Sequence, residues 1–482
     1  MQWLMPRASA ASVLGTVGWL LVVGACSTSS QSSPGGADSS APGADGGVRG
    51  EGGGEGGGDA SADGQASKTW DWVGVIGTGQ SLSVGAHGMP YNATTQPFHN
   101  LELSLGSATV PPFDPTSSAL SMAPLVEPLR GLAQTYPSAY PLNLYGETPH
   151  TAMASQISSL FQQSSAGGDY VTVHTVVGEN GQPMSVIDKT AVEVDSAGTT
   201  MGRAYAATLF EVGAIARLAG MAGKTYGVGA IVITHGESDA GNGGYESALV
   251  QLWSDYNKDL SALTGQTKSI PMLVSQQHSV PQGMGQTSAS TLAEWRVGVD
   301  HPGDIICSGP KYQYPYFTDN IHLTTQGYDL LGEKYGEVFF EKVVLGHDWQ
   351  PLQPIAASRA GMVVTVQFHV PVPPMAWDDT LPSPHPTNYP QWTQGRGFEV
   401  MFNGAPVNIT SVMIVNDAVQ ITTDTDVTTG TLTVAYAFTA DGAPMPGGTA
   451  RWGNLRDSDQ AAGATSHMPQ PNYAVAFTMR VP

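Results

Sequence analysis

The sequence has 482 residues and a formal net charge of −21 at pH 7, because 40 acidic side chains outnumber 19 Lys and Arg. This charge repels phosphate backbones, and the sequence has no basic patch or RNA-binding motif, so we expect no nucleic-acid partner. Its two cysteines, Cys26 and Cys307, give no disulfide framework, so the fold must depend on a hydrophobic core.

Residues 1–25 have the pattern of an export signal. Arg7 precedes an apolar stretch from 13 to 23, which is too short to span a bilayer comfortably. The ending Gly24-Ala25-Cys26 resembles a bacterial lipobox, which implies that Cys26 is the first mature residue and carries lipid. The alternative is ordinary cleavage near Ala25 that leaves a free cysteine. We expect an exported protein on a bacterial membrane surface, periplasmic or extracellular, whose membrane contact is this N-terminal lipid anchor.

Residues 26–68 are predicted to be a tether that starts at the lipidated cysteine. The segment consists mostly of Gly, Ser, Ala and Asp, and Val48 is its only aliphatic residue larger than alanine. Such a composition cannot bury enough apolar surface to offset the entropy lost on ordering, so we expect disorder.

Residues 69–346 alternate short apolar runs with segments of helical spacing. Strands are predicted at 73–76, 142–145, 170–177, 229–233 and 271–274, and helices at 204–218 and 245–263. Strands that alternate with helices favour a parallel sheet covered on both faces. Cys307 lies in a further apolar run and is expected to be buried as a small hydrophobe.

Ser81 is the candidate nucleophile. It follows the first predicted strand in the run Gly79-Gln80-Ser81, and α/β folds place their chemistry at the carboxyl edge of the sheet. Ser83 occupies the position where an α/β-hydrolase elbow needs its second glycine, so that elbow is excluded. A turn in which Ser81 only caps a helix is the structural alternative.

The segment Asp319-Asn320-Ile321-His322 supplies the partners that a nucleophilic serine needs. A base must stand beside the hydroxyl, and an acceptor must fix the tautomer of the imidazole ring. Asp319 lies three residues before His322, in a loop that leads into an apolar-periodic stretch from 328 to 340. An Asp that caps a helix beside an unrelated His is the alternative.

Three blocks together resemble the SGNH (GDSL-type) hydrolases. They are Gly79-Gln80-Ser81, His235-Gly236-Glu237-Ser238-Asp239 and Asp319-x-x-His322. They are most similar to the branch of sialate O-acetylesterases and acetylxylan esterases, over about residues 70–346. The resemblance implies a flavodoxin-like, three-layer α/β/α domain and a serine esterase with a Ser-His-Asp mechanism.

The resemblance also implies an oxyanion hole. Its donors would be the amides of Ser81 and Gly181, with Gly178 as the alternative glycine. His235 stands where the family usually has Gln or Asn, so it is the expected third donor, although its ring titrates near neutrality. In some relatives the residue at the position of Glu237 assists the catalytic histidine, which is His322 here. We rank Asp319 ahead of Glu237 because its spacing supplies the contact locally.

Residues 347–482 have a different pattern. Strand-like runs at 361–370, 397–402, 407–415, 431–438 and 473–479 alternate with turns rich in Pro, Gly and Asp, which predicts a small antiparallel β-sandwich domain. Trp377, Trp392 and Trp452 could form a sugar-stacking face. The alternative, which we favour, is that they fill a core or an interdomain seam.

The sequence therefore predicts a lipid-anchored serine esterase that removes acetyl groups from carbohydrate. We expect no cofactor and no metal, since metal-binding patterns such as His-Glu-x-x-His and Cys-x-x-Cys are missing from the sequence. His87 and His150 could line the mouth of the site. The alternatives are a lipase or thioesterase with the same three residues, and a non-catalytic glycan-binding lipoprotein that kept the fold.

Overall fold

The computed structural model describes residues 66–106, 114–129, 146–191, 202–281, 285–385 and 387–482. The chain divides into two units, Met1–Ser61 and Ala62–Pro482, and every described residue belongs to the second. The predicted lipidation site Cys26, the export signal, nearly all of the tether and the predicted strand at 142–145 lie outside the described residues.

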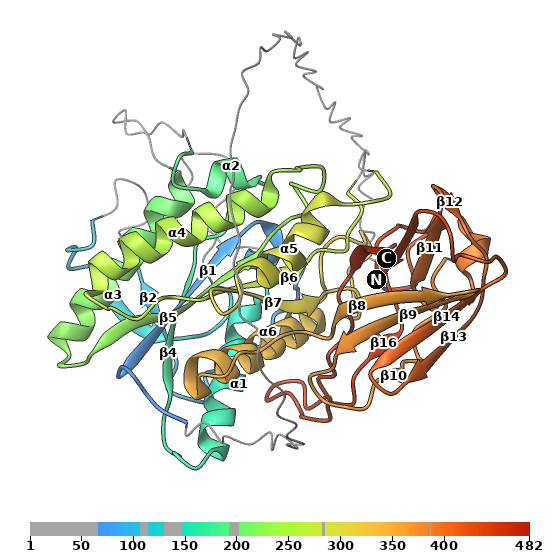
Figure 1. Cartoon of the computed structure of the whole chain (residues 1–482). Coiled ribbons are helices and arrows are strands. Elements are labelled where there is room, and N and C mark those ends of the chain that lie inside the picture. The colour runs from blue at the N-terminus through green and yellow to red at the C-terminus, as the bar shows by residue number, and fades with distance from the viewer. Residues whose placement is uncertain (1–65, 107–113, 130–145, 192–201, 282–284, 386) are drawn as a thin grey trace, which may run out of the picture. The chain divides into compact units, whose positions relative to one another are not determined.

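A seven-stranded sheet with the order β3-β2-β4-β1-β5-β6-β7 forms the centre of the α/β part (Figure 1). Its strands are β1 (Trp72–Gly79), β2 (Leu101–Ser104), β3 (Ser121–Pro124), β4 (Val171–Val176), β5 (Tyr226–Thr234), β6 (Met272–Gln276) and β7 (Ile305–Pro310). All neighbours pair in parallel except β2 and β3. The run β4-β1-β5-β6-β7 has the flavodoxin-like order, so the expected parallel sheet is confirmed.

Helices cover both faces of this sheet (Figure 1). They are α1 (Pro149–Gln163), α2 (Met184–Ile187), α3 (Arg203–Met221), α4 (Tyr245–Thr264), α5 (Ala289–Asp300) and α6 (Thr325–Phe339), and α6 continues into a π-helical segment, η2 (Phe340–Leu345). Val73 and Val75 of β1 pack in the cluster that contains α1 and α6, whereas Ile76 packs in the cluster that contains α3 and α4. This alternation buries both faces of β1, as expected for a strand at the centre of a covered sheet.

After η2 the strands pair in antiparallel fashion. They are β8 (Gln353–Ala360), β9 (Val363–His369), β10 (Ala376–Trp377), β11 (Phe398–Phe402), β12 (Ala405–Pro406), β13 (Ile409–Val415), β14 (Ala418–Thr423), β15 (Leu432–Tyr436), β16 (Leu455–Arg456) and β17 (Phe477–Val481), with a short helix η3 (Pro390–Trp392). They form two four-stranded sheets, β13-β14-β9-β8 and β12-β11-β15-β17, and the pair β10-β16. Phe368 of the first sheet contacts Phe398 and Phe477 of the second, with ring centroids 6.3 and 6.1 Å apart.

The tryptophans of this region do not form an exposed platform. Trp392 and Trp452 are 2% and 3% exposed, so their rings belong to the core. Trp377 is half-buried, and the guanidinium of Arg396 lies 5.1 Å from its ring centroid. The three rings therefore do not form a sugar-stacking face. Trp392 and Trp452 instead fill a core, which is the alternative favoured above.

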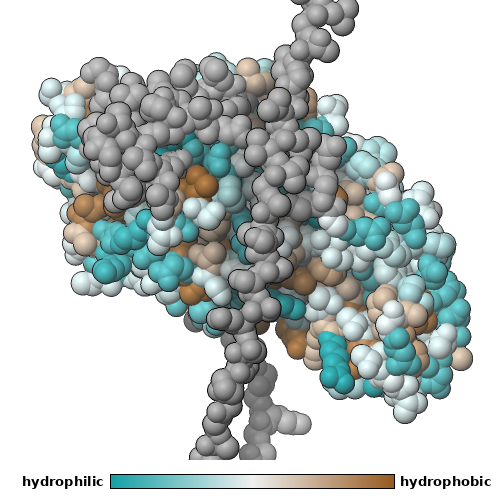
Figure 2. Space-filling model, turned by 90° about the horizontal axis from the view of Figure 1, so that it is seen from above, coloured by the Kyte–Doolittle hydropathy of each residue, from teal (hydrophilic) through white to brown (hydrophobic). Residues whose placement is uncertain are grey.

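The surface of the described residues is mixed in character. On the face drawn in Figure 2, the coloured residues show hydrophobic side chains in small groups among hydrophilic ones. Among the helices that the structure describes, none is both long and apolar enough to cross a membrane.

Candidate active site

Ser81 lies at the carboxyl end of β1, where the chain turns into the short helix η1 (Ser81–Val84). Gly79 makes this turn possible, because its φ is +133° and an added Cβ would lie 2.2 Å from the carbonyl oxygen of Thr234. No side chain caps η1, and the Ser83 hydroxyl instead donates to the carbonyl oxygen of Gln80 at 2.6 Å. Ser81 is therefore not a helix cap, and its hydroxyl is available for another partner.

That partner is His322, which lies 241 residues further along the chain. Ser81 Oγ is 2.8 Å from His322 Nε2, and His322 Nδ1 is 2.6 Å from Asp319 Oδ2. With a charged carboxylate beside Nδ1, the ring proton belongs on Nδ1, so Nε2 is the acceptor that faces the Ser81 hydroxyl. The three side chains thus form a continuous hydrogen-bonded chain from hydroxyl to carboxylate.

Asp319 is held in its charged form. Partial burial opposes ionisation, but hydrogen bonds from the His322 side chain and from the amides of His322 and Ile321 outweigh it and keep the pKa of Asp319 below its ordinary value. Both amides donate to Asp319 Oδ1 at 3.0 Å, which leaves Oδ2 for the imidazole. The three-residue spacing therefore fixes the carboxylate through its own loop.

The loop that carries Asp319 and His322 is bound at both sides. The amide of Phe317 donates to the carbonyl oxygen of His322 at 2.8 Å, which closes the loop before Thr324 caps α6. Asn320, whose φ is +57°, donates through its side chain to the carbonyl oxygen of Gly448 at 2.8 Å. A segment of the C-terminal part thus supports the loop from outside the α/β part.

Gly178 and Gly181 follow β4 beside the Ser81 turn. The amide of Glu179 donates to the carbonyl oxygen of Gly79 at 2.9 Å, and a Cβ added to Gly178 would lie 1.8 Å from Ser83 Oγ. Gly181 has a φ of +71°, and its carbonyl oxygen accepts from Ser238 Oγ at 3.2 Å. Gly178 therefore packs directly against η1.

Both ring nitrogens of His235 have hydrogen-bond partners within the protein. Its Nε2 donates to the carbonyl oxygen of Gln182 at 3.0 Å, so its Nδ1 accepts from the Tyr245 hydroxyl at 2.8 Å. Burial lowers the pKa of His235, which favours the neutral ring. Because both nitrogens have partners within the protein, the prediction that His235 completes the oxyanion hole is not retained.

Glu237 pairs with a lysine, whereas the alternative interpretation made it the residue that assists His322. Its Oε1 accepts from Lys311 Nζ at 3.1 Å, and both side chains are buried. The acid that contacts His322 is Asp319, so a catalytic role of Glu237 is not retained. Asp239 connects neighbouring loops, since its two oxygens accept from the Met184 amide and the Asn242 side chain.

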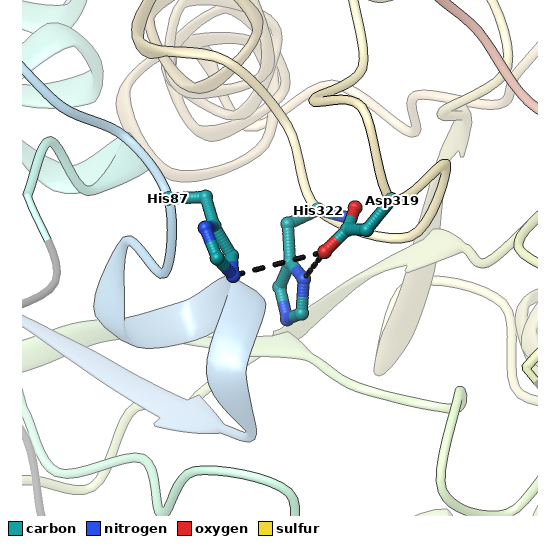
Figure 3. A group of neighbouring side chains, drawn as sticks. All are labelled: His87, Asp319 and His322. Atoms are coloured by element: carbon teal, nitrogen blue, oxygen red, sulfur yellow. Dashed lines mark hydrogen bonds and ion pairs between the residues drawn. The ribbon is translucent and has the colours of Figure 1, made fainter. Parts of the chain in front are cut away.

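The sequence named His87 and His150 as candidates to line the mouth of the site, and the structure separates the two. Its ring stacks on Phe317 with centroids 4.5 Å apart, and it lies 4.8 Å from the ring of His322. Figure 3 shows its Nε2 directed toward Asp319 Oδ2, at 3.7 Å. His150 is buried instead, with its Nδ1 3.0 Å from Nδ1 of His174, and burial lowers its pKa to about 3. His87 therefore lines the site, whereas His150 belongs to the core.

The sequence matches no protein-family model and no curated protein. Among solved structures, the chain is similar to XAC1771, a novel carbohydrate acetylesterase from Xanthomonas citri, with a TM-score of 0.51 and 14% identity over 84% of this chain and 80% of that one. The Arabidopsis thaliana protein AT4G34215 and the protein NanS each align with 56% of this chain at a TM-score of 0.39. Their identities are 15% and 11%, over 98% and 96% of their own chains. At 14% identity, the likeness to XAC1771 shows a shared fold.

Proposed function

We propose that this protein is a serine esterase of the SGNH type that removes O-acetyl groups from carbohydrate. The observation that carries the proposal is the chain of short contacts from Ser81 through His322 to Asp319, of 2.8 and 2.6 Å. The likeness in fold to a carbohydrate acetylesterase supports it, and so do the three sequence blocks that resemble this family.

The proposed reaction transfers the acyl group in two steps. Ser81 Oγ attacks the carbonyl carbon of the acetyl ester while His322 Nε2 takes the hydroxyl proton, and Asp319 stabilises the imidazolium. The carbon–oxygen bond to the sugar then breaks, and His322 gives the proton to the departing oxygen. Water, activated by the same nitrogen, attacks the acetyl-serine, which releases acetate and restores Ser81.

The developing oxyanion needs N–H donors that are already in place. We propose the backbone amide of Ser81 and the amide of Gly178 or Gly181. The contact between Gly178 and Ser83 now favours Gly178, because it places this glycine against the helix that begins with Ser81. The site needs no metal for this reaction.

The test is acetate release from acetylated xylan, an O-acetylated sialic acid and 4-nitrophenyl acetate. We expect activity on acetyl esters, and its loss in Ser81→Ala with an unchanged thermal unfolding midpoint. Ser254→Ala, on the exposed side of α4, is the matched control and should keep full activity. An active Ser81→Ala would contradict the proposal, and a preference for long-chain esters would favour the lipase alternative.

We also propose that the protein is anchored to a membrane surface through lipid on Cys26, with a tether up to residue 68. The α/β part would extend to residue 346, and the two later sheets would form a β-sandwich. The lipobox-like Gly24-Ala25-Cys26 and the change to antiparallel pairing after η2 support this division. Cys26→Ala should move the protein from the membrane fraction to the soluble fraction, and an unchanged distribution would contradict the anchor.

A further inference from the structure

His87 adds a third side chain with a possible metal ligand to the Asp319–His322 pair of the candidate active site (Figure 3). One ligand atom from each lies within 4.8 Å of the other two. His87 Nε2 and His322 Nδ1 approach the same oxygen, Asp319 Oδ2, at 3.7 and 2.6 Å. Ligand atoms around a tetrahedral Zn²⁺ lie roughly 3.3 Å apart, a spacing that falls between these two distances.

The chemistry of the donors selects the class of ion. Two imidazole nitrogens and one carboxylate oxygen are a set that suits Zn²⁺ and Cu²⁺, whereas Mg²⁺ and Ca²⁺ prefer oxygen ligands throughout. The side chains of His87 and Asp319 are 46% and 31% exposed, so an ion can reach them directly from solvent. A water molecule from that side would complete the tetrahedron.

The position of His87 is set by the fold. Its backbone φ is +65°, an uncommon conformation for a residue with a side chain, and its ring lies at 18° to the ring of Phe317. Phe317 belongs to the same loop as Asp319 and His322, so the stacking keeps His87 beside both of them. The site is therefore largely preformed, which reduces the entropy lost when an ion binds.

We propose that His87, Asp319 and His322 bind a divalent transition-metal ion, with Zn²⁺ as the best fit, and that the bound ion blocks ester hydrolysis. The blocking effect rests on the proposed function. Hydrolysis needs the His322 proton on Nδ1 and a lone pair on Nε2. An ion on Nδ1 uses the lone pair there, so the ring proton transfers to Nε2 through solvent. Nε2 then presents a proton to Ser81 Oγ and cannot take one.

The experiment titrates Zn²⁺ into the full chain after treatment with a chelator, by calorimetry and by hydrolysis of 4-nitrophenyl acetate. We expect one equivalent to bind, hydrolysis to stop, and EDTA to restore it. His87→Gln should weaken both binding and inhibition at least tenfold, each compared with the metal-free rate of that variant. His99→Gln is the matched control, because His99 is an exposed histidine that pairs with Asp169 at 2.9 Å, and it should behave as the wild type.

The two readouts separate this site from the proposed function. Zn²⁺ that does not bind, or that binds His87→Gln as tightly as the wild type, would overturn the site. Binding through His87 that leaves hydrolysis intact would overturn the blocking effect. A chain that hydrolyses no ester would contradict the proposed function, while the calorimetric comparison of wild type and His87→Gln would still decide the metal site.

Discussion

The choice between Asp319 and Glu237 as the acid beside His322 leads to opposite expectations for two conservative variants. In Asp319→Asn, the side-chain oxygen can still accept from the amides of Ile321 and His322, which now donate to Asp319 Oδ1 at 3.0 Å. The amide nitrogen then replaces Oδ2 and donates to His322 Nδ1. The ring proton must move to Nε2, so the base that faces Ser81 is lost.

The cost follows from this change of tautomer. Loss of the correct tautomer in a serine triad lowers kcat on the order of 10⁴-fold, and at about 1.36 kcal/mol per tenfold this raises the barrier by roughly 5.4 kcal/mol. The backbone contacts of the loop remain, so the thermal unfolding midpoint of Asp319→Asn should stay close to that of the wild type.

Glu237→Gln should show the opposite pattern. Glu237 Oε1 pairs with Lys311 at 3.1 Å in a buried position, and a neutral amide replaces the charged acceptor of that ammonium. Removing one partner of a buried pair costs about 3–5 kcal/mol of stability. We expect a lower unfolding midpoint with kcat within tenfold of the wild type. Calorimetry measures the unfolding midpoint, and 4-nitrophenyl acetate turnover measures kcat. If Glu237→Gln lost its activity while Asp319→Asn kept it and lost stability, the assignment of Asp319 would be refuted.

Three further outcomes follow from buried groups. Burial, with the charges of Glu147 and Glu333, raises the pKa of Asp329 to about 8, so its ionisation destabilises the fold as the pH rises from about 4, its unfolded pKa, toward 8. Asp329→Asn should therefore raise the unfolding free energy, relative to wild type, more at pH 8 than at pH 5. An equal increase at the two pH values, measured by denaturant unfolding, would contradict this. Gly79→Ala should lower the unfolding free energy by about 2 kcal/mol or more, because the new Cβ meets the carbonyl oxygen of Thr234. An unchanged urea midpoint would show that glycine is not needed at this position. Burial raises the pKa of the Cys307 thiol to about 12, so mass spectrometry should find its peptide alkylated by iodoacetamide only after unfolding, and labelling of the native protein would show that the thiol is accessible.

The sequence predicted best those features that depend on local spacing. The parallel strands β1, β4, β5 and β6 are short apolar runs between helical segments, and Asp319 reaches His322 within its own loop. The meeting of Ser81 and His322 followed from the rule that chemistry gathers at the carboxyl edge of such a sheet. Strands β2 and β3 have four residues each, too few for a clear periodicity, and were not predicted.

The sequence predicted least well the features that depend on distant partners. His235 stands at the position of an oxyanion donor, but Tyr245 and the carbonyl oxygen of Gln182 occupy its two nitrogens. Glu237 stands in the same block, and its partner Lys311 lies 74 residues away. The stacking of His87 on Phe317 likewise joins two segments that no local pattern connects. Such pairings become visible only when the sheet and its loops are assembled.

Reaction with an organophosphonate probe tests the central claim most directly, because such a probe modifies only a serine whose hydroxyl is activated. Peptide mass spectrometry of the treated protein should find one adduct, on Ser81, and His322→Ala should abolish it without lowering the unfolding midpoint. Ser81 that stays unmodified, or an adduct on another serine, would contradict the account and favour a non-catalytic protein or a different nucleophile.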